Sequence, residues 1–180
     1  MKKILLLLVI AAGFTACEGD QGPPGIPGAD GANGANDRAQ SFNTTINFSA
    51  PDYSQLVRYP ESIDVFPGDM TLVYIRFEQV PGNNGGQVDV YRLLPQTLYT
   101  DFGEFQYNYD FTNGDATIFL TGPDSTDFNN LTTADLDNQQ FRIVILPVEL
   151  VSSSTVDVTD YQAVMELADL SAADVIEIQN

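Results

Sequence analysis

The chain has 180 residues, with 7 Lys and Arg residues against 25 Asp and Glu residues, no His, no Trp and a single Cys. This acidity disfavours nucleic-acid binding, because little is available to neutralise phosphates. Without His, and with its only lysines at Lys2 and Lys3, the chain cannot build a Ser-His-Asp triad, a P-loop or a His-ligated zinc site. The hydrophobic fraction of 43% is too high for a disordered polyanion, so we expect a folded domain with an acidic surface.

The first 16 residues have the organisation of an export signal. Lys2 and Lys3 precede an apolar run over residues 4–12, and Thr15 and Ala16 supply small residues before Cys17. The apolar run is too short to span a bilayer, which takes about 20 residues. We therefore predict a signal peptide over residues 1–16. Its removal leaves five basic residues, all Arg, and a net charge of −20.

The residues that end at Cys17 resemble the lipobox of bacterial lipoproteins, with Phe14 in place of the usual Leu. In that family the Cys becomes the lipidated N-terminus, so the resemblance implies acyl chains such as palmitate on Cys17. A lone Cys in an exported chain has no disulfide partner, and lipidation accounts for it. The alternative is a plain secretory signal that leaves Cys17 as a free thiol.

Acidic residues follow the Cys at Glu18 and Asp20. In lipoproteins of Bacteroidota-like bacteria, which this chain resembles, such residues accompany export to the outer leaflet of the outer membrane. The resemblance therefore implies a protein that is lipid-anchored in the outer membrane and faces the cell surface. Attachment facing the periplasm is the alternative.

Glycine recurs at every third position after the Cys. The six positions are Gly19, Gly22, Gly25, Gly28, Gly31 and Gly34. With Gly at about 7% of residues, such a pattern arises by chance at roughly one in ten million per starting point. It resembles the Gly-X-Y repeat of collagen, in which only Gly fits at the axis of three polyproline-II chains.

Two structures are compatible with this repeat. Six triplets with few prolines form a triple helix only with help from a trimeric head or from crowding on a membrane, and the protein would then be a homotrimer. The interpretation that we favour is a Gly/Pro/Ala/Asn spacer. In either form, 18 residues at about 3 Å each make a stalk of roughly 55 Å. We assign residues 17–37 to the lipidated Cys and the collagen-like stalk, and residues 38–180 to a head domain.

Strand patterns dominate the head. Period-two alternation predicts strands over residues 42–48, 71–77, 105–111 and 116–120, another beginning at 88, and one over 56–66 interrupted at Pro60. Asn113-Gly114 predicts a hairpin, and residues 80–86 predict another connection of this kind. Residues 141–148 (FRIVILPV) are nearly all apolar, as in a strand buried on both faces. The predicted fold class is mainly β, an antiparallel β-sandwich of immunoglobulin-like or jelly-roll style.

One short C-terminal helix is expected. Thr159 to Gln162 fits a capping box, and Val164, Leu167 and Ala168 then lie on one face of the turns that follow. After this helix, either Ser171–Asp174 caps a second turn or residues 175–178 form a closing edge strand. The sequence does not decide between them.

Two groups of side chains are candidate ligand sites. Asp124, Asp127, Asp135 and Asp137 offer the oxygen ligands that calcium prefers, although a solvated acidic loop without a cofactor is the favoured interpretation. Phe105, Tyr107 and Tyr109 share one face of a predicted strand and would suit a sugar ring, but core packing is the favoured interpretation for this stripe too.

The sequence thus predicts a non-enzymatic, membrane-anchored lipoprotein with a structural or interaction role at the cell envelope. Its predicted partners are the membrane and an unidentified protein or glycan. The alternative is a calcium- or glycan-binding surface module. A more remote alternative is a carboxylate-based hydrolase, for which no sequence feature nominates a pair of acids.

Overall fold

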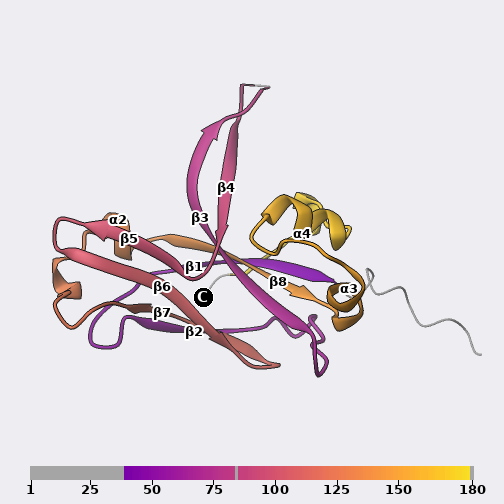
Figure 1. The fold of residues 1–180 in the computed structure, drawn as a ribbon, viewed down its shortest axis with the longest axis horizontal. Helices are drawn as coiled ribbons and strands as arrows, with labels where there is room; N and C mark the ends of the chain where they lie inside the picture. The colour runs from indigo at the N-terminus through magenta and orange to yellow at the C-terminus, as the bar shows by residue number, and fades with distance from the viewer. Residues whose placement is uncertain (1–38, 84, 179–180) are drawn as a thin grey trace, which may run out of the picture. The chain divides into compact units, whose positions relative to one another are not determined.

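The computed structural model describes residues 39–83 and 85–178, in which the chain forms two β-sheets and several short helices (Figure 1). The larger sheet, sheet A, has the strand order β4 (Gln87–Leu93), β3 (Met70–Pro81), β8 (Gln139–Leu146), β1 (Gln40–Ile46) and β9 (Ile176–Glu177). The smaller sheet, sheet B, has the order β2 (Ser54–Arg58), β7 (Asp115–Thr121), β6 (Gly103–Phe111) and β5 (Gln96–Thr100). The strand pairs described are antiparallel, except for the parallel pair of β1 and β9. The prediction of a mainly β fold with antiparallel sheets is confirmed.

The predicted signal peptide, Cys17 and the six repeat glycines lie outside the described residues.

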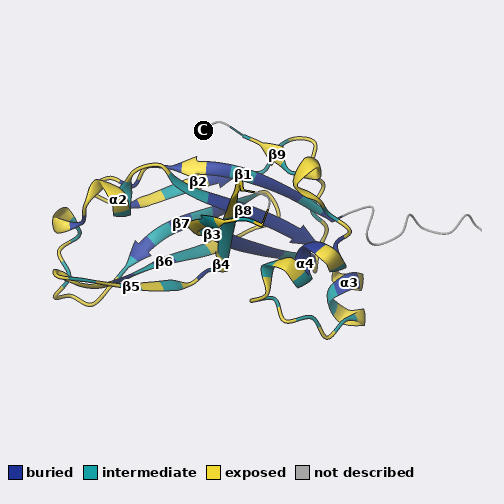
Figure 2. Cartoon of the chain, turned by 90° about the horizontal axis from the view of Figure 1, so that it is seen from above, coloured by how far each residue is buried: buried dark blue, intermediate teal, exposed yellow. Residues whose placement is uncertain are grey.

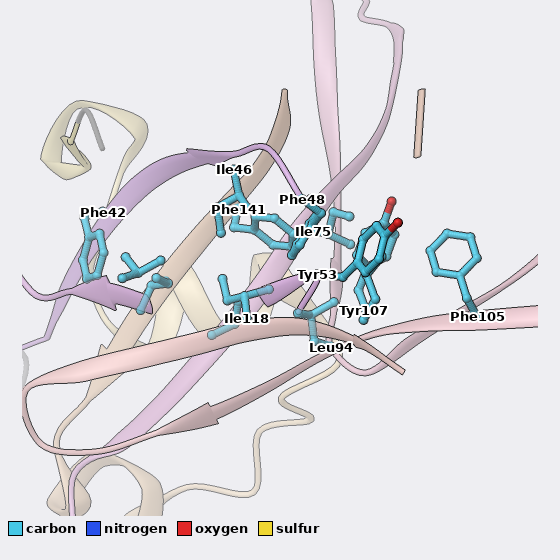
Figure 3. Packing of buried hydrophobic residues seen from close by; sticks show 14 of the residues in the cluster. Phe42, Ile46, Phe48, Tyr53, Ile75, Leu94, Phe105, Tyr107, Ile118 and Phe141 are labelled. Carbon is cyan, nitrogen blue, oxygen red and sulfur yellow. The ribbon is translucent and has the colours of Figure 1, made fainter. Parts of the chain in front are cut away.

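The main core lies between the two sheets, because alternate residues of each strand point to the same face. From β8 of sheet A, Phe141, Ile143 and Ile145 enter this core, and from sheet B come Tyr107 and Ile118. Figure 3 shows Phe141, Tyr107 and Ile118 in this core. The aromatic rings pack edge to face, a geometry that matches the quadrupoles of neighbouring rings. The ring centroids of Phe141 and Tyr107, for example, are 6.2 Å apart at an interplanar angle of 70°.

A second core covers the outer face of sheet A. The alternate β8 residues Val144 and Leu146 pack there against Leu150 of helix α3 (Val148–Ser153) and Val164 of helix α4 (Tyr161–Leu167). The strand β8 is therefore buried on both faces, as Figure 2 shows by its dark colour. The prediction from the apolar run is confirmed for the strand. The strand ends at Leu146, directly before Pro147, which is the N-cap of α3, so Val148 is already helical.

The predicted C-terminal helix is confirmed as α4, but its cap lies one residue later than expected. Asp160 is the N-cap and accepts a hydrogen bond from the backbone N–H of Ala163 at 3.1 Å, whereas Thr159 bonds to Asp157. Both predicted endings of the chain occur in succession. A capped 3-10 turn, η4 (Ala172–Asp174), leads directly into the edge strand β9.

Four other elements differ from the predictions. The strand predicted over residues 56–66 is confined to β2, and the short helices α2 (Thr133–Leu136) and α3 and the strand β5 were not expected. The turn from β5 into β6 requires Gly103, whose φ is +119° and whose added Cβ would lie 2.9 Å from the Thr126 hydroxyl oxygen. This glycine is the local sequence signal for the missed hairpin.

The strands β3 and β4 continue beyond the sandwich as a projecting two-stranded hairpin (Figure 1). We call residues 77–83 and 85–90 the β3–β4 arm. Its ladder runs from the pair Glu78 and Val90 to the pair Pro81 and Gln87, and a register shift separates it from the ladder at the sheet. Such a bulge increases local twist, which is consistent with the departure of the arm from the sheet.

The buried tyrosines predict how the domain responds to alkaline pH. Burial raises the pKa of five of the eight tyrosines, because desolvation penalises the phenolate: Tyr59, Tyr74, Tyr91, Tyr107 and Tyr109. A group whose pKa is higher in the folded chain contributes stability that is complete below the unfolded pKa, about 10 for Tyr, and is lost as the pH rises above it. We expect the urea midpoint to fall progressively above about pH 10.

The ultraviolet absorbance of phenolate measures the same transition. The chain has no Trp, so Trp absorbance does not overlap with this signal. We expect the five tyrosines whose pKa is raised to ionise together with the unfolding of the domain. If all eight ionised near pH 10 while the circular dichroism stayed native, the burial of these rings would be wrong.

Candidate functional site

The four predicted calcium ligands do not form a site. Asp127 accepts from the backbone and side chain of Asn129 and caps a 3-10 turn, while Asp135 accepts from the backbone and hydroxyl of Thr132 in a capping box. Asp124 and Asp137 are exposed. Over residues 39–83 and 85–178, no group of three or more acidic, His or Cys side chains lies close enough to hold a metal ion. Two of these carboxylates instead accept hydrogen bonds from N–H groups at the N-termini of short helices, as Asp commonly does.

The structure places the three side chains of the predicted sugar platform in or against the main core. Phe105 and Tyr107 are 0% and 2% exposed, and their rings pack together at 5.2 Å inside the main core. Tyr107 donates its hydroxyl hydrogen to the backbone carbonyl of Asp135 at 2.6 Å, and Tyr109 donates to that of Thr71 at 3.2 Å. The rings of Phe105 and Tyr107 are therefore inaccessible to a sugar, whereas Tyr109 is partly buried and packs against the same core.

The structure instead shows a hollow on the outer face of sheet A, which we call the outer groove. Its floor is formed by β4 and β8 and its wall by α4 and the segment after it, with a cavity volume of about 640 Å³. A second hollow of about 380 Å³ adjoins it toward β1 and β9. The two share four residues: Asp89, Tyr91, Arg142 and Ala172.

Arg142 is the central charged group of the outer groove. It lies on β8 in the middle of the apolar run, is 8% exposed, and its side chain lines both hollows. The register places it opposite Tyr74 of β3 and Asn43 of β1, and Asn43 opposite Glu177 of β9. Residues that pair across strands share a face, so these side chains form one row across sheet A.

Hydrogen bonds connect part of this row. Arg142 Nε donates to Asn43 Oδ1 at 2.8 Å, and Asn43 Nδ2 donates to Glu177 Oε1 at 2.5 Å. Arg142 Nη1 donates to the hydroxyl of Tyr161, the first residue of α4. Glu177 therefore neutralises Arg142 only indirectly, because Asn43 lies between them.

Two tyrosine rings hold the guanidinium in place. Its Cζ lies 4.5 Å from the ring centroid of Tyr91 and 5.6 Å from that of Tyr161, and the two rings lie 4.7 Å apart. Such cation–π contacts are most favourable when the cation is desolvated. Burial raises the pKa of Tyr91, and the positive charge of Arg142 opposes that rise. The guanidinium is thus fixed at the floor of the outer groove.

The acidic groups around the outer groove are engaged in local contacts. Asp89 accepts from Gln79 at 2.7 Å and lies 3.8 Å from Arg76 Nη1, and Asp160 caps α4. In the part of the chain that the structure describes, Arg142 has no carboxylate within 4.0 Å. The sequence signal for this site was the single Arg inside FRIVIL, which the periodicity alone did not mark as functional.

Comparison with known proteins found no match to this chain among family models, curated proteins or solved structures. None of the helices in the described ranges has the length and apolar character that are needed to cross a membrane.

The hydrogen-bonded row predicts a stability effect at Asn43. Replacing Asn43 with Ala removes the acceptor of a buried guanidinium N–H and the donor to Glu177, so we expect the free energy of unfolding to fall by about 1–3 kcal/mol. Urea unfolding measures the effect. Thr45→Ala, two residues along the same strand and exposed, is the matched control and should change the stability by less than about 0.5 kcal/mol. Equal effects in the two variants would show that the row contributes nothing.

Proposed function

We propose that this protein is a non-enzymatic, lipid-anchored protein of the bacterial outer membrane that presents an acidic β-sandwich head to a partner through the β3–β4 arm. The observation that carries the proposal is the arm itself. A two-stranded hairpin is only marginally stable by itself in water, and the arm leaves apolar side chains accessible, with Phe77 37% and Val88 50% exposed. Such a projecting surface is typical of a contact element.

Charged contacts hold the arm in its extended form without a partner. The guanidinium Cζ of Arg92 lies 3.6 Å from the ring centroid of Phe77, and Arg92 Nη2 lies 3.6 Å from Glu78 Oε1. Gln79 and Asp89 form a cross-strand hydrogen bond further along the arm. These side chains are partly exposed, so each contact contributes only a fraction of a kcal/mol to about 1 kcal/mol. The arm is therefore preorganised, which lowers the entropic cost of binding.

The anchor is supported by the sequence. The leader, Cys17 and the Gly-X-Y segment together form a lipid attachment followed by a stalk of roughly 55 Å. Residues 38–180 carry 5 Arg against 21 Asp and Glu residues, and this net charge of −16 makes like heads repel one another, which favours a partner with a basic surface over a second copy. A homotrimer joined through the stalk and head is the alternative arrangement.

The anchor is tested with Cys17→Ala in the native host. We expect the wild-type chain to label with palmitate and to fractionate with the outer membrane, and the variant to lose both properties. Protease added to intact cells should digest the wild-type head, with a periplasmic protein as the protection control. Membrane association that persists in the variant, or a head protected on intact cells, would contradict the proposal.

The role of the arm is tested by photo-crosslinking on intact cells. A photoreactive residue at Val88 should give a defined adduct at several times the yield of the same residue at Leu56, which is 44% exposed on β2 of the other sheet. An adduct mass equal to a multiple of the chain's own mass would indicate the homotrimer. Equal crosslinking yields at Val88 and Leu56 would contradict the proposal that the arm is the contact element.

A further inference from the structure

We propose that the outer groove is a binding site for a small molecule with one carboxylate, which Arg142 holds through charge-assisted hydrogen bonds. This inference goes beyond the proposed function and does not depend on the lipid anchor. It rests on the burial of Arg142, on its contacts, and on the two hollows that meet at its guanidinium.

The burial of Arg142 is the first argument. An Arg this deeply buried is rare unless a carboxylate pairs with it, because removing a cation from water costs several kcal/mol. Within residues 39–83 and 85–178, however, the side-chain amide oxygen Oδ1 of Asn43 and the hydroxyl oxygen of Tyr161 are the acceptors of its hydrogen bonds. Both are neutral groups. The site therefore has a fixed positive charge whose direct counter-ion is missing from the described chain.

The geometry of the guanidinium is the second argument. A guanidinium has five N–H groups, and the two contacts engage one on Nε and one on Nη1. The remaining N–H groups are those that form a two-bonded fork with a carboxylate. The rings of Tyr91 and Tyr161, which are tilted by 34° to each other, both lie against the guanidinium and restrict its movement. The site is preorganised, so a ligand does not have to order it.

The surroundings select the size and charge of the ligand. A cavity of about 640 Å³ lies in the range of small-molecule pockets. Its lining includes Asp89 and Asp160, and the adjoining hollow includes Glu177. These carboxylates, and the net charge of −18 of the chain, repel polyanions. They can, however, accept hydrogen bonds from hydroxyl or ammonium groups.

The ligand class that follows is a monocarboxylate with hydroxyl or amino groups beside the carboxylate. An acidic sugar and an amino acid both have this chemistry. The apolar side chains that also line the groove, such as Val90 and Met165, contact the carbon skeleton of either. A neutral sugar lacks the group that Arg142 is placed to bind.

The experiment titrates the full chain, purified in detergent, with two matched pairs of probes by calorimetry at low ionic strength. Glucuronate is compared with glucose, and alanine with alaninamide. We expect at least one carboxylate probe to bind with a Kd in the roughly micromolar to millimolar range, and its partner without a carboxylate to bind at least about tenfold more weakly. Binding of glucuronate alone indicates an acidic sugar, binding of alanine alone indicates an amino acid, and binding of both shows recognition of the carboxylate itself.

Arg142→Lys keeps the charge but loses the fork, and it should weaken binding at least about tenfold. Arg58→Lys is the matched control, because Arg58 is exposed on β2 of the other sheet and does not line the outer groove. Its affinity should equal that of the wild type. If Arg142→Lys does not fold, Tyr161→Phe removes only the hydroxyl acceptor and should weaken binding about three- to tenfold.

The inference is overturned if neither carboxylate probe binds, if the neutral partners bind equally well, or if the groove variants leave the affinity unchanged. These results would not contradict the proposed function, because palmitate labelling and crosslinking at the arm do not involve Arg142.

Discussion

The fold depends on burying both faces of sheet A. Its central strand β8 contributes Phe141, Ile143 and Ile145 to the core against sheet B, and Val144 and Leu146 to the core under α3 and α4. Each fully buried side chain of this size contributes roughly 1.5–3 kcal/mol, and without any disulfide among the described residues this packing is the main source of stability. The C-terminal helices are thus required by the sheet, because they cover the apolar face that sheet B does not.

Arg142 is the exception within that strand, and its surroundings show how a charge is accommodated there. The strand register places Asn43 and Tyr74 beside it, and α4 places Tyr161 over it. The outer groove exists because α4 covers only part of sheet A, so the apolar cover ends beside the buried cation. The same arrangement that stabilises the second core therefore leaves the largely buried positive charge of Arg142 at the floor of the outer groove, in a strongly acidic protein.

Most strands were predictable, because alternation along a strand reflects one buried and one solvated face. The strand β5 was missed because its alternation in QTLYT is short, and α3 was missed because the apolar run continued through Val148 while Pro147 ended the strand. The role of the candidate calcium ligands could not be predicted for a different reason. Asp127 and Asp135 carry the oxygens of a calcium site, but only their three-dimensional positions show that each caps a separate turn.

The sequence by itself determined the acidity, the absence of His and of any Lys after residue 3, the anchor and stalk as predictions, and the mainly β class of the head. These follow from composition and from patterns that span a few residues. Tertiary structure decided which aromatic rings are core, which carboxylates are caps, and that Arg142, Tyr91 and Tyr161 meet in one groove. The physical reason is that these contacts join β4, β8 and α4, and strand register and helix packing, which bring them together, are fixed only when both cores form.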